Sequence, residues 1–135
     1  MPTVRCLPYV HLDTDIPFWV SRWSFLKHFD QTDFLCRSVC DVSDAYLDSW
    51  FCMNPDGDRY FLIPPVSIHS QRTQFIAGRH RTVVLLKHLD RIPLSFETRD
   101  IADTDRTWIN YIVSARIELN SVLELPDLPI HSSLP

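Results

Sequence analysis

The stretch "QFIAGRHRTVVLLKHLDRIPLSF", residues 74–96, decides the fold class of this chain. An apolar run stops at Gly78, and the basic residues Arg79, His80 and Arg81 follow at once. A second apolar run then ends in "IPLSF". This order predicts a strand over 74–77, a helix over 81–89 and a further strand over 92–96.

Further elements are expected on both sides of this unit. The expected strands cover 4–12 and 60–68, the turns 13–17 and 54–59, a hairpin loop 69–73, and the helices 18–29, 42–53 and 100–123. Strands that alternate with helices indicate an α/β or α+β fold, with a small mixed sheet flanked by helices. We expect one domain over 1–123, followed by a Pro-rich C-terminal tail over 124–135 that packs on the surface or is disordered.

The composition narrows the class of protein. The chain has 135 residues, 45% of them hydrophobic, which suits one globular domain. Its net charge of -4 argues against a dedicated DNA-binding role, because such proteins carry a basic face. No run approaches the ~18 apolar residues of a membrane span, and the N-terminus lacks a secretory signal. The prediction is therefore a cytoplasmic protein with no membrane contact.

In a cytoplasmic protein the four cysteines are expected to be reduced. Cys36 and Cys40 lie four residues apart, so zinc could use them with His28 or Cys52. Structural zinc sites more often show Cys-x2-Cys pairs, and buried thiols are the better interpretation. No metal site is predicted.

The residues at Gly78 suggest an anion-binding site. A helix start offers unpaired backbone N–H groups and the positive end of the helix dipole, and a glycine lets an anion approach the backbone. Arg79 or Arg81 can hold two phosphate oxygens with a planar guanidinium. His80 can donate to phosphate or act as an acid or base, and Thr82 can add a hydroxyl.

The same residues also have a purely structural interpretation. Gly78 can serve only a tight turn, and His80 can bond to backbone carbonyls. Arg79 and Arg81 can be solvated or paired with an acid such as Asp90. A glycine followed by basic residues does not by itself decide between the two interpretations.

Carboxylates follow the first expected strand. Asp13 or Asp15 can act as a base or bind Mg²⁺ if this strand ends near the basic cluster. Both can instead cap the turn over 13–17. Glu97 and Asp100 form a second acidic candidate. Asp13 is predicted as the catalytic carboxylate, together with His80 and Arg81.

Read with its flanks, "PPVSIHSQRTQFIAGRHRTVVLLKHLDRIPLSF" (64–96) resembles the core of the ParB/sulfiredoxin-like superfamily. The shared order is a proline (here Pro65), a strand, a hairpin, a strand, a Gly-x-x-Arg phosphate motif, a helix and Ile-Pro before a strand. Gly78 to Arg81 match the motif, and Ile92-Pro93 match the end signal. "VHLDTDIP" (10–17) loosely resembles the first strand and turn of the family. The resemblance implies a ParB/sulfiredoxin-like domain in which 78–82 hold the phosphates of ATP or CTP. A nearby carboxylate could add Mg²⁺ to this site.

Two departures limit what the resemblance implies. Arg79 stands where sulfiredoxins carry their catalytic cysteine, which argues against sulfinic acid reduction. The residues after Phe96 are too few for the DNA-binding region of a complete partition protein.

Three functions remain from the sequence. The favoured one is a nucleotide-dependent enzyme that transfers a phosphoryl group to a small molecule or hydrolyses the nucleotide. The alternatives are a regulatory module that binds a nucleotide or a protein partner without chemistry, and a nuclease or DNA-binding accessory protein.

Overall fold

The computed structural model describes residues 3–29 and 44–132, which form an α+β fold. Within these ranges there are three α-helices: α1 (Arg22–His28), α3 (Arg79–Leu86) and α4 (Asp103–Ile112). The strands form three sheets. The fold class predicted from the sequence is confirmed at this level.

The largest sheet contains the unit around Gly78. Its strands are ordered β7-β6-β8-β2-β9, with bounds Arg72–Phe75, Pro65–His69, Arg91–Glu97, Asp15–Ser21 and Ala115–Arg116. β6 and β8 run parallel, and every other pair is antiparallel. The predicted order of strand, hairpin, strand, helix and strand is therefore confirmed, with α3 as the connection between β7 and β8.

The second sheet joins the two ends of the described chain. Its order is β10-β1-β5-β4, with bounds Leu123–Pro126, Thr3–Tyr9, Arg59–Leu62 and Phe51–Met53. β1 is parallel to β5 and antiparallel to β10. A short parallel pair, β3 (Tyr46–Leu47) with β11 (Ile130–His131), forms the third sheet.

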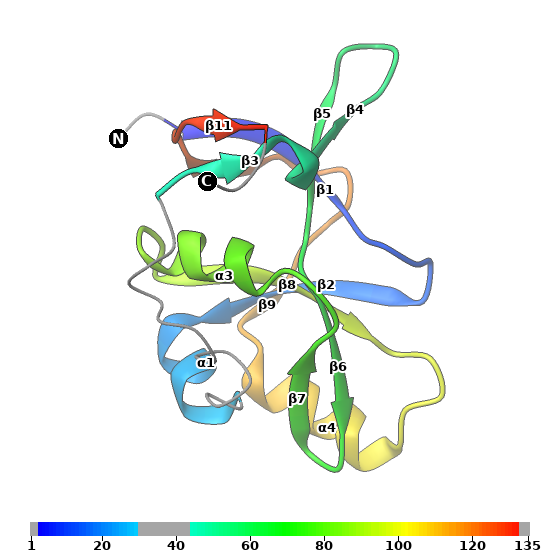
Figure 1. The fold of residues 1–135 in the computed structure, drawn as a ribbon. Coiled ribbons are helices and arrows are strands. Elements are labelled where there is room, and N and C mark those ends of the chain that lie inside the picture. The colour runs from blue at the N-terminus through cyan, green and yellow to red at the C-terminus, as the bar shows by residue number, and fades with distance from the viewer. Residues whose placement is uncertain (1–2, 30–43, 133–135) are drawn as a thin grey trace.

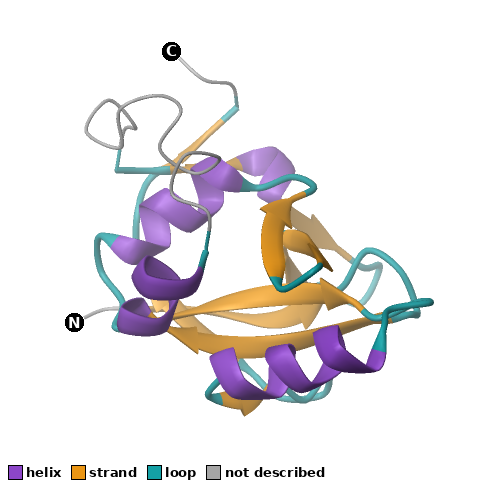
Figure 2. Cartoon of the chain, turned by 90° about the horizontal axis from the view of Figure 1, so that it is seen from below, coloured by secondary structure: helices purple, strands orange, loops and turns teal. Residues whose placement is uncertain are grey.

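Helix α3 lies between the two larger sheets, above the five-stranded sheet, while α1 and α4 lie below that sheet (Figure 1). The view from below shows α4 in front of the central strands (Figure 2). All five residues from Thr82 to Leu86 are buried, which is the pattern of a helix covered on every side. α3 therefore holds its N-terminus and the preceding glycine at a fixed place between the sheets.

The N-terminal third differs from the prediction. Strand β2 replaces the last three residues of the turn expected over 13–17 and the first four residues of the helix expected over 18–29. The turn is confirmed at Asp13 and Thr14, and the helix is confirmed as α1, which begins after Ser21. β2 pairs with β8 over its whole length, so a long-range partner overrides the local helical spacing of the aromatic residues. The Ser21 hydroxyl accepts from the Ser24 N–H and caps the shortened helix.

Two more predicted helices are corrected. The described part of 42–53 forms β3, the 3-10 turn Asp48–Trp50 and β4, and it contains no α-helix. The helix expected over 100–123 ends at Ile112, and the chain continues as β9 and β10. The "NPDGDR" turn is confirmed, because it connects β4 to β5 with Gly57 at a positive φ of 88°.

The Pro-rich segment from residue 124 is not a surface tail in its described part. It supplies most of β10, which pairs with β1, and all of β11. Leu123 and Leu125 are buried in the core, and the Tyr46 hydroxyl donates to the Pro126 carbonyl. This segment is therefore part of the fold.

No helix in the described ranges is long and apolar enough to cross a membrane. The described cysteines, Cys6 and Cys52, are free thiols. Burial raises the pKa of Cys6 to about 12, so this thiol stays protonated and unreactive at neutral pH. Cys36 and Cys40 lie outside the described residues.

Candidate functional site

Gly78 occupies a backbone position that suits only glycine. Its φ of 87° and ψ of 23° lie in the left-handed region, directly before α3. A Cβ atom at Gly78 would lie 2.7 Å from Pro64 Cβ and 2.9 Å from Arg81 Nη2. The missing side chain therefore makes room for the guanidinium group of Arg81 on top of the turn.

Arg81 is held in this position by the backbone. Its Nη1 donates to the carbonyl of Leu62, at the end of β5, over 2.5 Å. Its Nε is buried and has no hydrogen-bond partner within 3–29 and 44–132. Burial lowers the pKa of Arg81 to about 10, so the side chain remains cationic at neutral pH. The guanidinium of Arg81 is therefore a cation with a fixed orientation, and its Nε–H still lacks a hydrogen-bond acceptor in the described residues.

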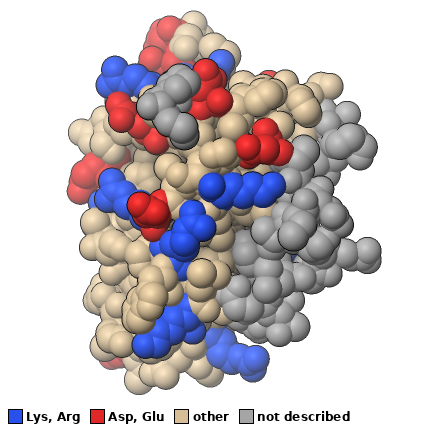
Figure 3. All heavy atoms as spheres, turned by 90° about the vertical axis from the view of Figure 1, so that its left-hand side faces the viewer, with Lys and Arg blue, Asp and Glu red and all other residues tan. Residues whose placement is uncertain are grey.

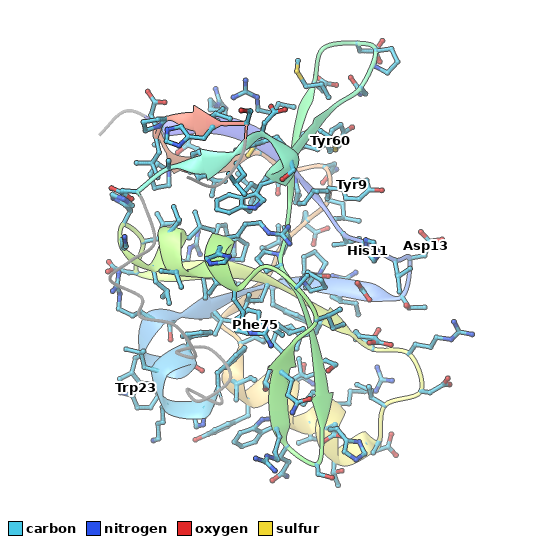
Figure 4. The ribbon with its side chains drawn as sticks, in the orientation of Figure 1. Tyr9, His11, Asp13, Trp23, Tyr60 and Phe75 are labelled. Atoms are coloured by element: carbon cyan, nitrogen blue, oxygen red, sulfur yellow. The ribbon has the colours of Figure 1, made fainter. Side chains whose placement is uncertain are left out.

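Arg81 lines a cavity of about 220 Å³ between the two larger sheets. The remaining lining residues come from the ends of β1 and β5, the start of β6 and the loop before α3: Tyr9, His11, Leu62, Ile63, Pro65, Ile76 and Ala77. Figure 4 shows Tyr9 and His11 on the same side of the molecule, His11 in the loop that follows β1. A mostly apolar cavity with a few polar groups is the usual form of a small ligand site.

The other residues predicted to bind phosphate are not among those that line this cavity. The Arg79 guanidinium lies 5.9 Å from the centre of the Phe75 ring, and its Nη2 is 3.5 Å from the Phe75 carbonyl. The Thr82 hydroxyl is buried and donates back to the Gly78 carbonyl over 3.0 Å. His80 is exposed on the first turn of α3. Of the side chains predicted to bind phosphate, only Arg81 lines the cavity, and the other polar side chains that line it are those of Tyr9 and His11.

Asp13 is not brought to the Arg81 cavity. It is exposed and lines a second cavity of about 570 Å³ at the start of β2. The walls of this second cavity are Asp13 to Pro17, Thr98, Arg99 and residues 116–120. The predicted catalytic set of Asp13, His80 and Arg81 is thus divided among three places.

Asp15, two residues further along the chain, differs from Asp13 because it is buried and its pKa is raised. It is 6% exposed, lines the second cavity and faces Glu97 across the β2–β8 pair. Burial raises the pKa of Asp15, and the negative charge of Glu97 raises it further. The Leu12 N–H, His11 and Ser95 act in the opposite direction with a smaller effect.

Tyr9, His11 and the pairing of Asp15 with Glu97 were missed as site features in the sequence. The alternation of Ile16, Phe18 and Val20 was the available signal for a strand in place of the expected turn and helix. With that strand, Asp15 would have been placed in a sheet and not in a turn.

No group of three or more His, Cys, Asp or Glu side chains is arranged to hold a metal ion in the described parts of the chain.

On the face drawn in Figure 3, the visible basic side chains form separate patches with acidic groups between and above them.

No family model, no curated protein and no solved structure matches this chain.

Proposed function

We propose that the Arg81 cavity binds the phosphate of a nucleotide, ATP or CTP. The observation that carries this proposal is the state of Arg81, a half-buried cation whose Nε donor is buried and unsatisfied in the described residues and whose Nη1 is held by the Leu62 carbonyl. A phosphate oxygen would supply both the missing acceptor and the missing negative charge. The resemblance of residues 64–96 to the ParB/sulfiredoxin-like superfamily supports the same ligand.

The size of the cavity indicates which part of the nucleotide enters. Its volume of about 220 Å³ is below the ~300–1,000 Å³ of pockets that enclose a whole drug-sized ligand. A phosphate group would occupy it, near the first backbone N–H groups of α3, which have no partner within the helix. The sugar and base would extend toward Tyr9, which is 44% exposed and forms an edge-to-face pair with Tyr60.

Phosphoryl transfer to a small molecule, or hydrolysis of the nucleotide, is the enzymatic form of this proposal. His11 is the titratable side chain of the cavity besides Arg81 and Tyr9, and it replaces His80 as the candidate acid or base. Arg81 would stabilise the charge on the transferred group.

One observation favours the second candidate, a module that binds a nucleotide without chemistry. No carboxylate is among the residues that line the Arg81 cavity, so the usual base or Mg²⁺ ligand of phosphoryl transfer is missing from its walls. Tight binding without turnover would identify this candidate.

Calorimetric titration with ATP and CTP, with and without Mg²⁺, tests the proposal. We expect Arg81→Ala to weaken binding by at least about tenfold and Arg81→Lys to restore part of the loss. Arg79→Ala is the matched control, because it removes a basic residue of the same motif that does not line the cavity. Failure of the wild-type protein to bind ATP, CTP and inorganic triphosphate would refute the proposal, as would equal loss in both alanine variants that remain folded.

A further inference from the structure

The second cavity, at the start of β2, carries charges of both signs on its walls. Its volume of about 570 Å³ lies within the ~300–1,000 Å³ range of pockets that enclose small ligands. Residues 13–17 and the segment 116–120 line it from two distant parts of the chain. The two segments lie side by side because the Ile117 N–H donates to the Pro17 carbonyl over 2.9 Å.

Three carboxylates and one guanidinium of this cavity have no ion-pair partner among the described residues. The carboxylates are those of Asp13, Asp15 and Glu118, and the guanidinium is that of Arg116. Arg99 also lines the cavity, but it pairs with Asp100 at 3.8 Å and lines the neighbouring cavity of about 390 Å³ as well. Three uncompensated negative charges therefore face one uncompensated positive charge.

Asp15 is the wall residue at which an uncompensated charge costs most free energy. It is 6% exposed, whereas the other three charged side chains are exposed. The Leu12 N–H and the Ser95 hydroxyl lie beside its carboxyl group, but burial and the charge of Glu97 outweigh them and raise its pKa. Neutral donors thus compensate the charge of Asp15 only in part, and a bound cation would complete the compensation.

The remaining side chains of the cavity limit the kind of ligand. Several of them are apolar: Ile16, Pro17, Ile117 and Leu119. A metal ion would use the carboxylates alone, and a simple anion would use the guanidinium alone. A ligand that combines cationic groups, an anionic group and methylene groups would contact all three kinds of wall residue.

We propose that the second cavity binds a free basic amino acid of the kind of lysine, arginine or ornithine. Asp15 binds the α-ammonium group, and Arg116 holds the α-carboxylate with its planar guanidinium. The cation of the ligand side chain meets the exposed carboxylates of Asp13 and Glu118, and its methylene groups contact the apolar wall. The proposal goes beyond nucleotide binding and does not depend on the Arg81 cavity.

Calorimetric titration of the wild-type protein with L-lysine, L-arginine and L-ornithine, without nucleotide, provides the test. We expect at least one of them to bind with a Kd of about 1 mM or lower. Three analogues of that ligand each lack one charge: its Nα-acetyl derivative, its amide, and norleucine, citrulline or norvaline with an uncharged side chain. Each analogue should bind at least about tenfold more weakly, because one charged contact is lost.

Asp15→Asn and Arg116→Gln should each weaken binding of the amino acid at least about tenfold. Both variants should fold, because Arg116 is exposed and Asp15→Asn removes a repulsion with Glu97. Asp103→Asn and Arg106→Gln are the matched controls and should bind as the wild type does. Each removes an exposed charge of α4 that does not line the cavity.

Three results would overturn the amino-acid site. Walls that carry only solvated charges predict no binding of lysine, arginine or ornithine at concentrations up to about 10 mM. Equal binding of the analogue with an uncharged side chain would contradict the assignment to basic amino acids. Unchanged affinity in Asp15→Asn and Arg116→Gln would contradict the assigned cavity. Arg81→Ala should bind the amino acid as the wild type does, so this titration and the nucleotide titration can fail independently.

Discussion

Gly78 and Arg81 together form the turn at the start of α3, in which the position of one residue depends on the other. The guanidinium of Arg81 occupies the space that a Cβ on Gly78 would need, and its Nη1 is held by the Leu62 carbonyl. A change at either residue therefore alters the position of the same positive charge. The effects of the two residues on anion binding should not be additive.

Gly78→Ala should cost about 2–4 kcal/mol of unfolding free energy and weaken nucleotide binding. The substitution combines a left-handed φ of 87° with a contact of 2.7 Å to Pro64, and it displaces Arg81. Gly57→Ala is the matched control, because Gly57 has a φ of 88° but nothing within 4 Å of the added Cβ. We expect about 1–2 kcal/mol there and unchanged binding, both measured by chemical denaturation and calorimetry. Equal effects of the two substitutions on binding would contradict the assigned role of Gly78.

Asp15→Asn should change how the free energy of unfolding depends on pH. The pKa of Asp15 is raised in the folded state, so between its unfolded and folded values the native protein binds more protons than the unfolded chain. The free energy of unfolding must then fall as pH rises from about 4 toward neutral. The asparagine variant lacks this fall and should be the more stable protein at pH 7.

Denaturant titrations at pH 4 and pH 7 measure this effect. Asp13→Asn, at an exposed position in the same cavity, should keep the pH dependence of the wild type. A wild type that gains stability from pH 4 to pH 7 relative to Asp15→Asn would show that the assigned sign is wrong.

At the scale of elements, the turn between β6 and β7 is held by a helix from elsewhere in the chain. Ser70 and Gln71 both have positive φ, 52° and 60°, although neither is glycine. The buried Asp105 carboxylate on α4 accepts from both backbone N–H groups, over 3.3 Å and 2.8 Å. These bonds offset the strain of the turn and attach the hairpin to α4.

Asp105→Ala should destabilise the protein by about 2–3 kcal/mol, because two hydrogen bonds to a charged carboxylate are lost. We expect faster amide hydrogen exchange at Ser70 and Gln71 before the rest of the sheet is affected. Asp103→Ala, at an exposed position of the same helix, is the control and should change stability by about 0.5 kcal/mol or less. Unchanged exchange at the turn in Asp105→Ala would contradict this account.

The elements predicted from the sequence are those with local causes. Residues 59–97 follow the predicted order, because the turn at 54–59, the hairpin and the Gly78 break are determined by nearby residues. The helix expected over 18–29 was wrong over its first four residues, because β8 determines the structure of β2 from a distant part of the sequence. Distance along the sequence also explains which site residues could be predicted. Gly78 and Arg81 belong to a local motif, whereas Tyr9 and His11 reach the cavity only through the pairing of β1 with β5.

At the scale of the whole molecule, the C-terminal segment closes the second sheet. Leu125 is fully buried next to β1, while its neighbour Glu124 is exposed. Leu125→Ala should cost about 2–5 kcal/mol, and Glu124→Ala about 0.5 kcal/mol or less, by chemical denaturation. A small effect of Leu125→Ala would mean that residues 123–126 contribute little to the core.

The pairing of β1 with β10 also has a consequence for how the chain folds. The Cys6 thiol is 3.9 Å from the Leu123 carbonyl, although 117 positions of sequence separate the two residues. Contacts between such distant positions raise the contact order and slow folding, because a long loop must close before they form. During synthesis, β1 leaves the ribosome long before its partner β10 exists. Until then its edge is open to other strands, which exposes the growing chain to non-native strand pairing.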